Sequence, residues 1–317
     1  MKIAVIIPAY KCKDQILTVL SAIPPLVSTI FVVDDSCPLN TGDYVTAHCK
    51  DPRVQVLRHT HNQGVGGAMC TGYKHGLAED AEIFVKLDGD GQMDPSHIPR
   101  FVEPILDGRA DYTKGNRFTS VEDLRKMPLI RLIGNLGLSF MNKLSSGYWK
   151  ILDPTNGYTA IHRTALSLIP FEKISKRYFF ESDFLFRLGL VGAKVVDIPV
   201  ASRYADEISH LSPFKSLFEF SGKHLRNALK RLIYRYFLLD FNLASIEIVF
   251  GLFLVVFGLT YGGYNWWWSL VHQTFTSTGT VVLSSTALLM GLQLILAFLS
   301  FDMTLQPTEA LQSRHNR

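Results

Sequence analysis

Residues 85–92 read Val85-Lys86-Leu87-Asp88-Gly89-Asp90-Gly91-Gln92, an apolar run that ends in two carboxylates with a glycine between them. In an extended chain, residues two apart project to the same side, so Asp88 and Asp90 can grip one divalent cation. Hard oxygen ligands suit Mg²⁺ or Mn²⁺, and such an ion would neutralise a diphosphate. A solvent-facing Asp-Gly turn explains this motif equally well when it is taken alone. The surrounding sequence decides between the two interpretations.

Short apolar runs alternate with helical patterns over the first 210 residues. The strand-like runs are Ile3–Ile7, Thr29–Val33, Val54–Leu57, Ile83–Leu87 and Val195–Ile198, and the helical patterns are Gln15–Ala22, Gly67–Leu77 and Pro95–Leu106. Continuous apolar strands separated by helices are typical of βαβ units, which predicts an α/β fold with a buried, mostly parallel sheet. Such sheets bind ligands beyond the carboxyl ends of their strands.

Polar signals follow each of the first four strands. They are Pro8-Ala9-Tyr10, Asp34-Asp35-Ser36, Asn62-Gln63-Gly64-Val65-Gly66-Gly67-Ala68 and the acidic turn itself. The glycines of the third signal would let the backbone approach a ligand, and the helix that follows would favour an anion at its N-terminus. Four such signals after four consecutive strands are hard to explain as independent turns.

Composition excludes several classes of protein. With 47% apolar residues, the chain is not disordered. Its 32 basic and 28 acidic residues give a formal charge of +4, which makes no general case for nucleic-acid binding. Four cysteines without a C-x-x-C pair argue against a zinc site and suit a reducing compartment. Met1–Tyr10 shows no signal peptide, so the N-terminal part is predicted to stay in the cytosol.

Two long apolar segments lie beyond residue 240. Leu243–Tyr261 contains one charged residue and Val281–Phe301 contains none. As helices, each would reach about 30 Å, close to the thickness of a bilayer core. Two buried core helices are the alternative, which the uncharged length disfavours. Trp266, Trp267 and Trp268 follow the first segment, as an interfacial aromatic belt would.

Charge asymmetry sets the expected orientation. The loop Gly262–Thr280 carries no charged residue, whereas the segment before the first span is basic at Lys215, Lys223, Arg226, Lys230, Arg231 and Arg235. The positive-inside rule therefore predicts a multi-pass inner (plasma) membrane protein whose catalytic domain and both termini lie in the cytosol.

Two further segments have an apolar stripe at helical spacing. Residues 129–149 and the basic residues 211–240 are both interpreted as amphipathic helices in the membrane surface. We therefore expect a catalytic domain at 1–210, a juxtamembrane helix at 211–240, a two-helix transmembrane hairpin at 241–303 and a cytosolic tail at 304–317. Gly251 and Gly258 on one face of a span are compatible with association, which leaves a homo-oligomer open.

The chain resembles the family 2 glycosyltransferases, which have the GT-A fold, and most of all the polyisoprenyl-phosphate glycosyltransferases of the dolichol-phosphate mannosyltransferase and GtrB-like group. Three more motifs carry this resemblance: Gly115-Asn116-Arg117, Asp153-Pro154-Thr155-Asn156-Gly157-Tyr158 and Phe180-Glu181-Ser182-Asp183. The resemblance assigns nucleotide-sugar binding to Pro8, Ala9, Tyr10, Asp35, Asn62, Gly66, Asp88, Gly89, Glu181 and Asp183. It assigns the metal to Asp88, Asp90 and Gln92, and the acceptor phosphate to Arg117, Arg131, Asn135 and Arg203. The catalytic residues it implies are Asp90, Asp153, Arg117 and Arg131.

The implied reaction is metal-dependent inverting transfer of one sugar from a nucleotide sugar, UDP-glucose favoured, to polyprenyl phosphate at the cytosolic membrane face. The alternatives are transfer to a glycolipid or polysaccharide, and a non-catalytic nucleotide-binding assembly module. The chain departs from the family at Lys11-Cys12, where an Asn-Glu pair is usual, and at Glu207-Ile208-Ser209-His210. It has no Gln-x-x-Arg-Trp motif, which argues against a processive polysaccharide synthase.

Overall fold

A computed structural model describes residues 1–117, 129–200 and 213–315, and the side chains at 129–133, 135, 213–218 and 315 lie outside that description. The chain divides into two compact units, one formed by residues 1–228 and 307–317 and the other by residues 229–306.

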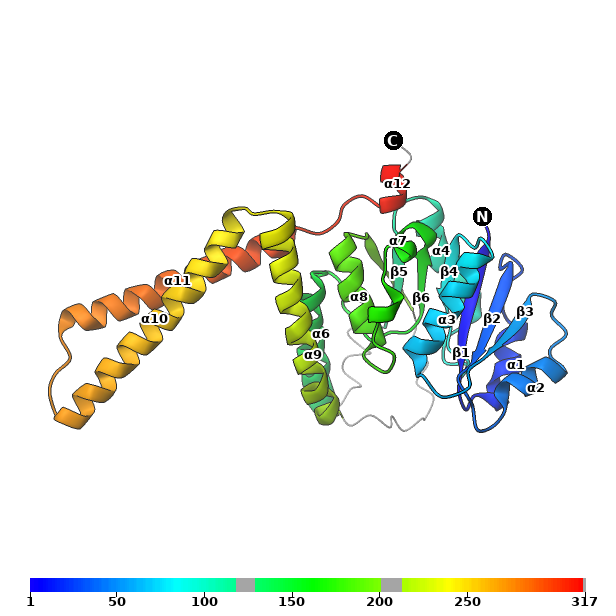
Figure 1. The fold of residues 1–317 in the computed structure, drawn as a ribbon, viewed down its shortest axis with the longest axis horizontal. Coiled ribbons are helices and arrows are strands. Elements are labelled where there is room, and N and C mark those ends of the chain that lie inside the picture. The colour runs from blue at the N-terminus through cyan, green and yellow to red at the C-terminus, as the bar shows by residue number, and fades with distance from the viewer. Residues whose placement is uncertain (118–128, 201–212, 316–317) are drawn as a thin grey trace. The chain divides into compact units, whose positions relative to one another are not determined.

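The first unit is built on a seven-stranded sheet with the order β3-β2-β1-β4-β6-β5-β7 (Figure 1). The strands are β1 (Ile3–Ala9), β2 (Thr29–Asp34), β3 (Val54–Arg58), β4 (Ile83–Lys86), β5 (Tyr112–Asn116), β6 (Thr159–His162) and β7 (Val195–Pro199). Every neighbouring pair is parallel except the two pairs that β6 makes. The predicted α/β fold with a mostly parallel sheet is therefore confirmed.

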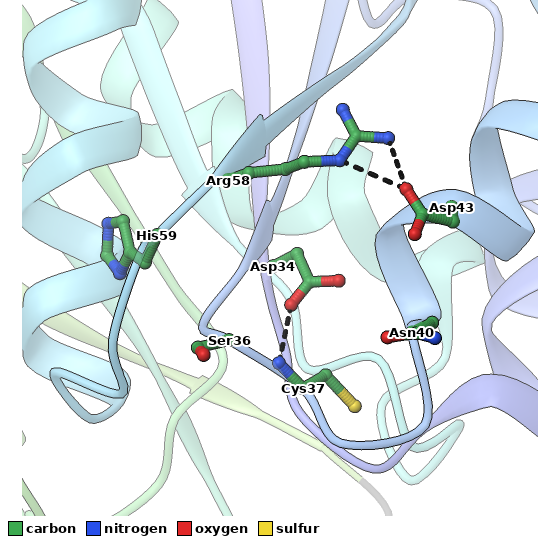
Figure 2. A pocket seen from close by; sticks show the side chains of 7 residues that line it. All are labelled: Asp34, Ser36, Cys37, Asn40, Asp43, Arg58 and His59. Atoms are coloured by element: carbon green, nitrogen blue, oxygen red, sulfur yellow. Dashed lines mark hydrogen bonds and ion pairs between the residues drawn. The ribbon is translucent and has the colours of Figure 1, made fainter.

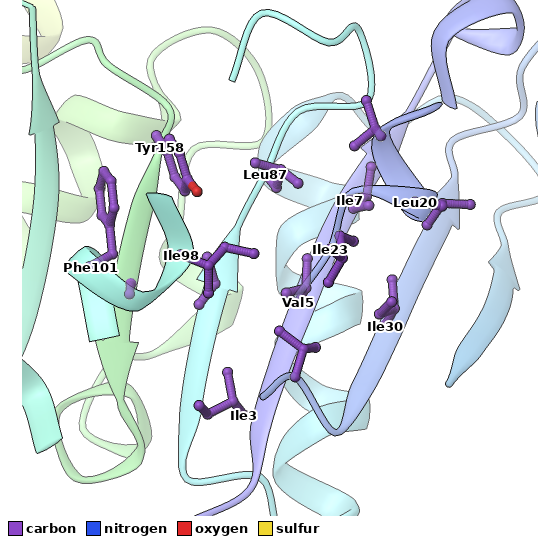
Figure 3. Close-up of a cluster of buried hydrophobic side chains, with 14 of the residues drawn as sticks. Ile3, Val5, Ile7, Leu20, Ile23, Ile30, Leu87, Ile98, Phe101 and Tyr158 are labelled. Atoms are coloured by element: carbon purple, nitrogen blue, oxygen red, sulfur yellow. The ribbon is translucent and has the colours of Figure 1, made fainter. Parts of the chain in front are cut away.

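Helices cover both faces of this sheet because successive residues of the central strands are apolar and point to opposite sides. Ile3, Val5 and Ile7 pack with α1 (Lys13–Ser21), α2 (Thr41–His48) and α4 (Ile98–Leu106), as Figure 3 shows in part. Ala4 and Ile6 belong to a second cluster with α3 (Val65–Ala78), α7 (Arg163–Ser167) and α8 (Phe180–Val191). The unit also contains two short 3₁₀ turns, η1 (Pro95–His97) and η2 (Phe171–Lys173).

The sequence analysis did not predict strands β5 and β6. The five expected strands are present within two residues of their expected ends, but β5 and β6 were not expected. Strand β5 contains a fully buried lysine, Lys114, and β6 is only four residues long. Neither segment is a continuous apolar run, so the pattern that found the other strands fails here.

Two of the helices bury polar groups and expose apolar ones. Helix α6 (Leu129–Ser146) exposes Leu136 and Phe140, and α9 (Pro213–Ile233) exposes Leu225. The inward side of α9 carries His224 and Asn227 instead, and both are buried. Exposed apolar side chains of this kind are typical of helices whose outer face meets lipid, and the membrane-surface position of both segments stays a prediction.

The second unit is a helical hairpin. It begins with the last residues of α9, from Leu229, and continues with a π-helical segment, η3 (Tyr234–Leu239), α10 (Leu243–His272) and α11 (Thr278–Thr304). Both long helices are apolar enough to cross a membrane, and most of their apolar windows is exposed, which disfavours the core-helix alternative. Helix α10 continues through the three tryptophans, so the polar connection is shorter than expected.

Glycines pack the two helices of the hairpin against each other. A Cβ at Gly251 would lie 2.9 Å from Ile295, and one at Gly258 would lie 2.7 Å from Leu288. A Cβ at Gly291 would lie 2.8 Å from the main-chain nitrogen of Val255. These small residues serve packing within the chain, so they supply no argument for a homo-oligomer.

The C-terminal residues return to the first unit. Asp111 accepts hydrogen bonds from the main-chain N–H of Leu311 (2.9 Å) and Gln312 (3.3 Å) at the start of α12 (Leu311–His315). The Gln312 amide also donates to the carbonyl oxygens of Ile105 and Ala110. The expected tail is therefore anchored on the sheet unit rather than free.

Candidate active site

The carboxyl ends of β1 to β4 meet at one edge of the sheet. Ala9 lies opposite Asp34, Asp34 lies opposite Arg58, and Ile6 lies opposite Lys86. Because these four strands are parallel, the polar signals that follow them in the sequence gather at this edge. The site is built here.

The turn after β1 presents one aromatic ring. Tyr10 is exposed, whereas Ala9 is buried and can offer a ligand only its main chain. The next residue, Lys11, adopts a left-handed conformation (φ 58°) and its N–H donates to Cys37 Sγ at 3.1 Å. This contact fixes the turn after β1 against the loop after β2.

Asp35 is buried and fixes the loop that leads into α3. Its Oδ1 accepts from the N–H of Gln63 (2.8 Å) and its Oδ2 from the N–H of Gly64 (2.7 Å). Its Oδ1 also lies 2.7 Å from His59 Nδ1, and the Asn62 amide donates to its main-chain oxygen. Asp35 and Asn62, which were both expected in the nucleotide-sugar site, thus lie together, and the carboxylate is engaged by the chain itself.

A small polar pocket of about 210 Å³ adjoins this loop. It is lined by Asp34, Ser36, Cys37, Asn40, Asp43, Arg58 and His59, at the ends of β2 and β3 and the start of α2 (Figure 2). Arg58 pairs with Asp43 at 2.9 Å, and the Asp34 carboxylate accepts from the N–H of Cys37 and Gly42. The pocket offers hydrogen-bonding groups to a small polar ligand.

Gly66, in the first turn of α3, packs closely against the segment that leads into α8. A Cβ there would collide with the carbonyl oxygen of Ser175 and lie 2.8 Å from the Phe180 ring. Its N–H donates to the carbonyl oxygen of Lys176 at 2.8 Å, and the N–H of Gly67 shares that acceptor. These two helix-terminal donors were expected to approach an anion, but the structure gives them a partner within the chain.

The acidic turn is tightly built. A Cβ at Gly89 would lie 2.9 Å from Cys12 Sγ, and Gly91 adopts φ +79°, which a side chain would strain. Asp90 Oδ1 accepts from the N–H of Gln92 at 3.0 Å. The Asp88 side chain is 31% exposed. The turn therefore presents its first carboxylate to solvent from a rigid backbone.

Lys86 is a site residue that the sequence prediction missed. Its side chain is 2% exposed, and its ammonium lies 3.0 Å from Asp88 Oδ1 and 3.3 Å from Glu181 Oε1. Burial alone lowers the pKa of Lys86, but the two carboxylates outweigh it and raise the pKa above its ordinary value. A lysine inside a buried strand that ends in aspartate was the available signal.

Arg117 and Asp153 form a second ion pair at this edge. The guanidinium donates from Nε to Asp153 Oδ2 (2.7 Å) and from a terminal nitrogen to Oδ1 (3.0 Å). Burial tends to raise the pKa of Asp153, but the hydrogen bonds and charge of Arg117 lower it below its ordinary value. Asp153 therefore stays ionised near neutral pH and is poorly suited to accept a proton.

The loop that contains Asp153 joins the two clusters. A Cβ at Gly157 would collide with Lys86 Nζ and lie 2.9 Å from Asp88 Oδ2. The buried Lys114 ammonium donates to the carbonyl oxygen of Asn156, and burial lowers the pKa of Lys114 to about 8. The loop before β6 thus contacts two buried lysines, Lys86 of β4 and Lys114 of β5, the two strands that flank β6.

The side chains of Glu181 and Asp183 have different partners. Glu181 faces Lys86, whereas Asp183 accepts from Arg187 (3.1 Å) and from Asn227 (3.1 Å) on α9. Residues two apart on a helix point in opposite directions, so both could not face one site. Of the two carboxylates, Glu181 reaches the Lys86 cluster and Asp183 does not; that this segment lines the sugar site stays a prediction.

Three expected phosphate-binding residues cannot be placed. Arg131 and Asn135 lie on α6 with side chains outside the description, and Arg203 lies outside the described residues.

The carboxylates suit a metal that is shared with a ligand. Within residues 1–117, 129–200 and 213–315, no three His, Cys, Asp or Glu side chains gather closely enough to hold a metal alone. Mg²⁺ typically uses one or two protein carboxylates and takes its other ligands from water and substrate phosphates. The partly exposed Asp88 carboxylate, in the turn with Asp90, fits that donor set.

Comparison with known proteins places this geometry in a family. Residues 4–169, just over half the chain, match the model described as glycosyl transferase family 2. The undecaprenyl-phosphate mannosyltransferase of Micrococcus luteus is 31% identical over 204 residues, 63% of this chain and 83% of that protein. The UDP-N-acetylglucosamine–dolichyl-phosphate N-acetylglucosaminyltransferase of Methanococcus voltae is 29% identical over 218 residues, 64% of this chain and 86% of that protein.

A solved structure supports the fold. Glucosyl-3-phosphoglycerate synthase from Mycobacterium tuberculosis, solved with Mn²⁺, UDP and phosphoglyceric acid, superposes with a TM-score of 0.51 at 20% identity. The match covers 73% of this chain and 78% of that chain. The sheet unit has the GT-A fold, and the chain belongs to glycosyl transferase family 2 and is a glycosyltransferase.

Proposed function

We propose that this protein transfers one sugar from a nucleotide sugar, with UDP-glucose as the first candidate, to polyprenyl phosphate at the cytosolic face of the inner membrane. The observation that carries the proposal is the sheet edge itself. There the partly exposed Asp88 carboxylate and the Arg117–Asp153 pair are joined by a single loop through Gly157. A donor diphosphate and an acceptor phosphate need such neighbouring sites of opposite character.

The acceptor is proposed from the chain's apolar surfaces and from its relatives. Two long apolar helices and the exposed apolar faces of α6 and α9 suit a lipid-borne substrate. The two relatives described above are named for undecaprenyl phosphate and dolichyl phosphate, both polyprenyl phosphates. Their names differ in the sugar, so the donor is chosen by experiment.

The chemistry is a single displacement. An oxygen of the acceptor phosphate attacks the anomeric carbon, the bond to the nucleoside diphosphate breaks, and the configuration at that carbon inverts. The acceptor phosphate is already ionised near pH 7, so no strong base is required. Arg117 would align the acceptor phosphate, and Asp153 orients Arg117 through two hydrogen bonds.

A divalent metal is part of the proposal. Asp88 and Asp90, with Gln92 beside them, would hold Mg²⁺ or Mn²⁺ against the donor diphosphate. The metal would neutralise charge on the leaving diphosphate. The related fold was solved with Mn²⁺ and UDP and also with Mg²⁺ and UDP, which supports testing both ions.

The test is glycolipid synthesis by the purified full-length protein in detergent. Radiolabelled UDP-glucose, UDP-N-acetylglucosamine and GDP-mannose are each supplied with undecaprenyl or dolichyl phosphate, and with Mg²⁺, Mn²⁺ or EDTA. We expect a metal-dependent glycolipid from one donor, and a loss of about a hundredfold or more in rate for Asp90→Asn.

The matched control is Asp80→Asn. Asp80 is an exposed carboxylate on the segment that enters β4, at the opposite edge of the sheet. It should retain full activity. No glycolipid from the wild-type protein with any donor, or product only on a glycolipid or polysaccharide acceptor, would refute the proposed acceptor.

A further inference from the structure

Lys86 is an unusual residue for its position. It occupies a central strand, with Ile6 of β1 on one side and Thr159 of β6 on the other, and its side chain is 2% exposed. An ammonium is buried at high cost unless carboxylates compensate it. The compensating groups come from two distant parts of the chain, Asp88 at 3.0 Å and Glu181 at 3.3 Å.

The surrounding backbone makes room for this cation. At Gly157 a Cβ would collide with Lys86 Nζ and lie 2.9 Å from Asp88 Oδ2. The neighbouring lysine, Lys114, lies in register with the same residue of β6, Thr159, and is also fully buried. Its ammonium donates to a carbonyl oxygen rather than bridging Asp88 and Glu181. Two lysines with equal burial therefore differ in what they neutralise.

We propose that Lys86 is the resident counter-cation of the site. In the free protein its ammonium pairs with the Asp88 carboxylate and opposes the binding of a bare divalent ion. It favours the binding of an ion that arrives together with a diphosphate. This inference rests on the proposed function, because it takes Asp88 as a metal ligand. A bare divalent ion on Asp88 would share one carboxylate with an ammonium, and like charges in a partly buried site repel strongly. A metal–diphosphate complex brings negative charge that the ammonium attracts.

This model separates two affinities that a purely structural lysine would change together. Removing the ammonium should tighten the binding of the bare ion and weaken the binding of the ion with nucleotide. A lysine that only keeps the strand folded would weaken both. Lys86 acts as a positioning and charge-compensating residue, because its ammonium contacts the carboxylates of Asp88 and Glu181.

The experiment is a Mn²⁺ titration of the full-length protein in detergent, followed by the electron paramagnetic resonance signal of free Mn²⁺, with and without saturating UDP. For Lys86→Met we expect the affinity for Mn²⁺ alone to rise about tenfold, and the affinity in the presence of UDP to fall. The matched control is Lys114→Met, which should leave the ratio of the two affinities as it is in the wild type.

Two outcomes overturn the inference and leave the proposed function intact. One is a Lys86→Met protein whose Mn²⁺ affinity falls or stays constant without UDP. The other is a Lys114→Met protein that reproduces the shift. If Lys86→Met does not fold, Glu181→Gln serves instead: the ammonium then pairs with Asp88 alone, and the affinity for bare Mn²⁺ should fall. A wild-type protein that binds no Mn²⁺ even with UDP refutes the metal assignment in the proposed function, and the role of Lys86 with it.

Discussion

Buried ion pairs occur in both units of the described chain, and the Arg231–Asp302 pair of the hairpin unit is built differently from the Lys86 cluster of the sheet unit. In the hairpin unit, Arg231 donates to both oxygens of Asp302, at 2.7 and 2.8 Å, and the Tyr236 hydroxyl donates to the same carboxylate at 2.5 Å. The side chains of this pair are 5% and 1% exposed. In the sheet unit, Lys86 is equally buried, but its partners Asp88 and Glu181 are 31% and 14% exposed.

The difference separates a structural cluster from a candidate site. Asp302 has both oxygens engaged within the chain, so it offers little to a ligand. One carboxylate oxygen of Asp88 lies beside the Lys86 ammonium, and the side chain is partly exposed. A ligand can therefore reach this carboxylate. A buried charge with exposed partners is a better indicator of a site than a buried charge alone.

The largest effect is expected at the hairpin cluster. Asp302→Ala leaves the buried Arg231 without its carboxylate and should lower the free energy of unfolding by about 3–5 kcal/mol. Denaturant unfolding in detergent measures this loss. Asp88→Ala should cost less, because Glu181 still neutralises Lys86 and water reaches the position.

A double variant sharpens this comparison. Arg231→Met with Asp302→Leu removes both charges and should recover most of the lost stability, since an apolar pair of similar volume often replaces a buried ion pair. If Asp302→Ala is as stable as the wild type, the hairpin cluster has no structural role.

A smaller effect concerns a buried group without a counter-charge. His224 of α9 lies 2.8 Å from Ser145 Oγ of α6, and burial lowers the pKa of His224 to about 4. The unfolded chain takes up this proton near pH 6.5 and the folded protein only near pH 4. The stability contributed by neutral His224 is therefore full above pH 6.5 and is lost as the pH falls toward 4, by about 3 kcal/mol at most.

The variant His224→Gln should flatten this dependence. Unfolding is measured at several values between pH 7 and pH 4, and the difference between wild type and variant is the quantity of interest. A wild-type protein and a variant that lose stability in parallel over this range would contradict a neutral His224.

The smallest effect is expected at the exposed pair beside the pocket. Arg58 and Asp43 are paired at 2.9 Å, but their side chains are 49% and 70% exposed. Exposed ion pairs contribute about 0–1 kcal/mol, so Arg58→Ala should change the free energy of unfolding by no more than that. A loss above 2 kcal/mol would show that Arg58 supports the ends of β2 and β3 in a way that its exposure does not suggest.

Much of the site could be read from local pattern. Tyr10, Asp35 and Asp88 follow apolar strands, and parallel strands bring their carboxyl ends to one edge wherever they pair. The contacts of Gly66 and Asp183 could not be predicted from local pattern. In the structure, the N–H of Gly66 donates to the carbonyl oxygen of Lys176, and Asp183 accepts from Arg187 and Asn227. Contacts between segments far apart in the sequence leave no local pattern by which to predict them.

The sequence by itself determined the alternation of strands and helices, the acidic turn at Asp88–Asp90 and the two apolar spans, because periodicity and strand-end chemistry are local properties of the chain. Only the tertiary structure decided that Lys86 bridges Asp88 and Glu181, that Arg117 is locked by Asp153, and that β6 runs against its neighbours. Each of these depends on which distant segments become neighbours. The free energy of a buried charge depends on those neighbours and not on its position in the sequence.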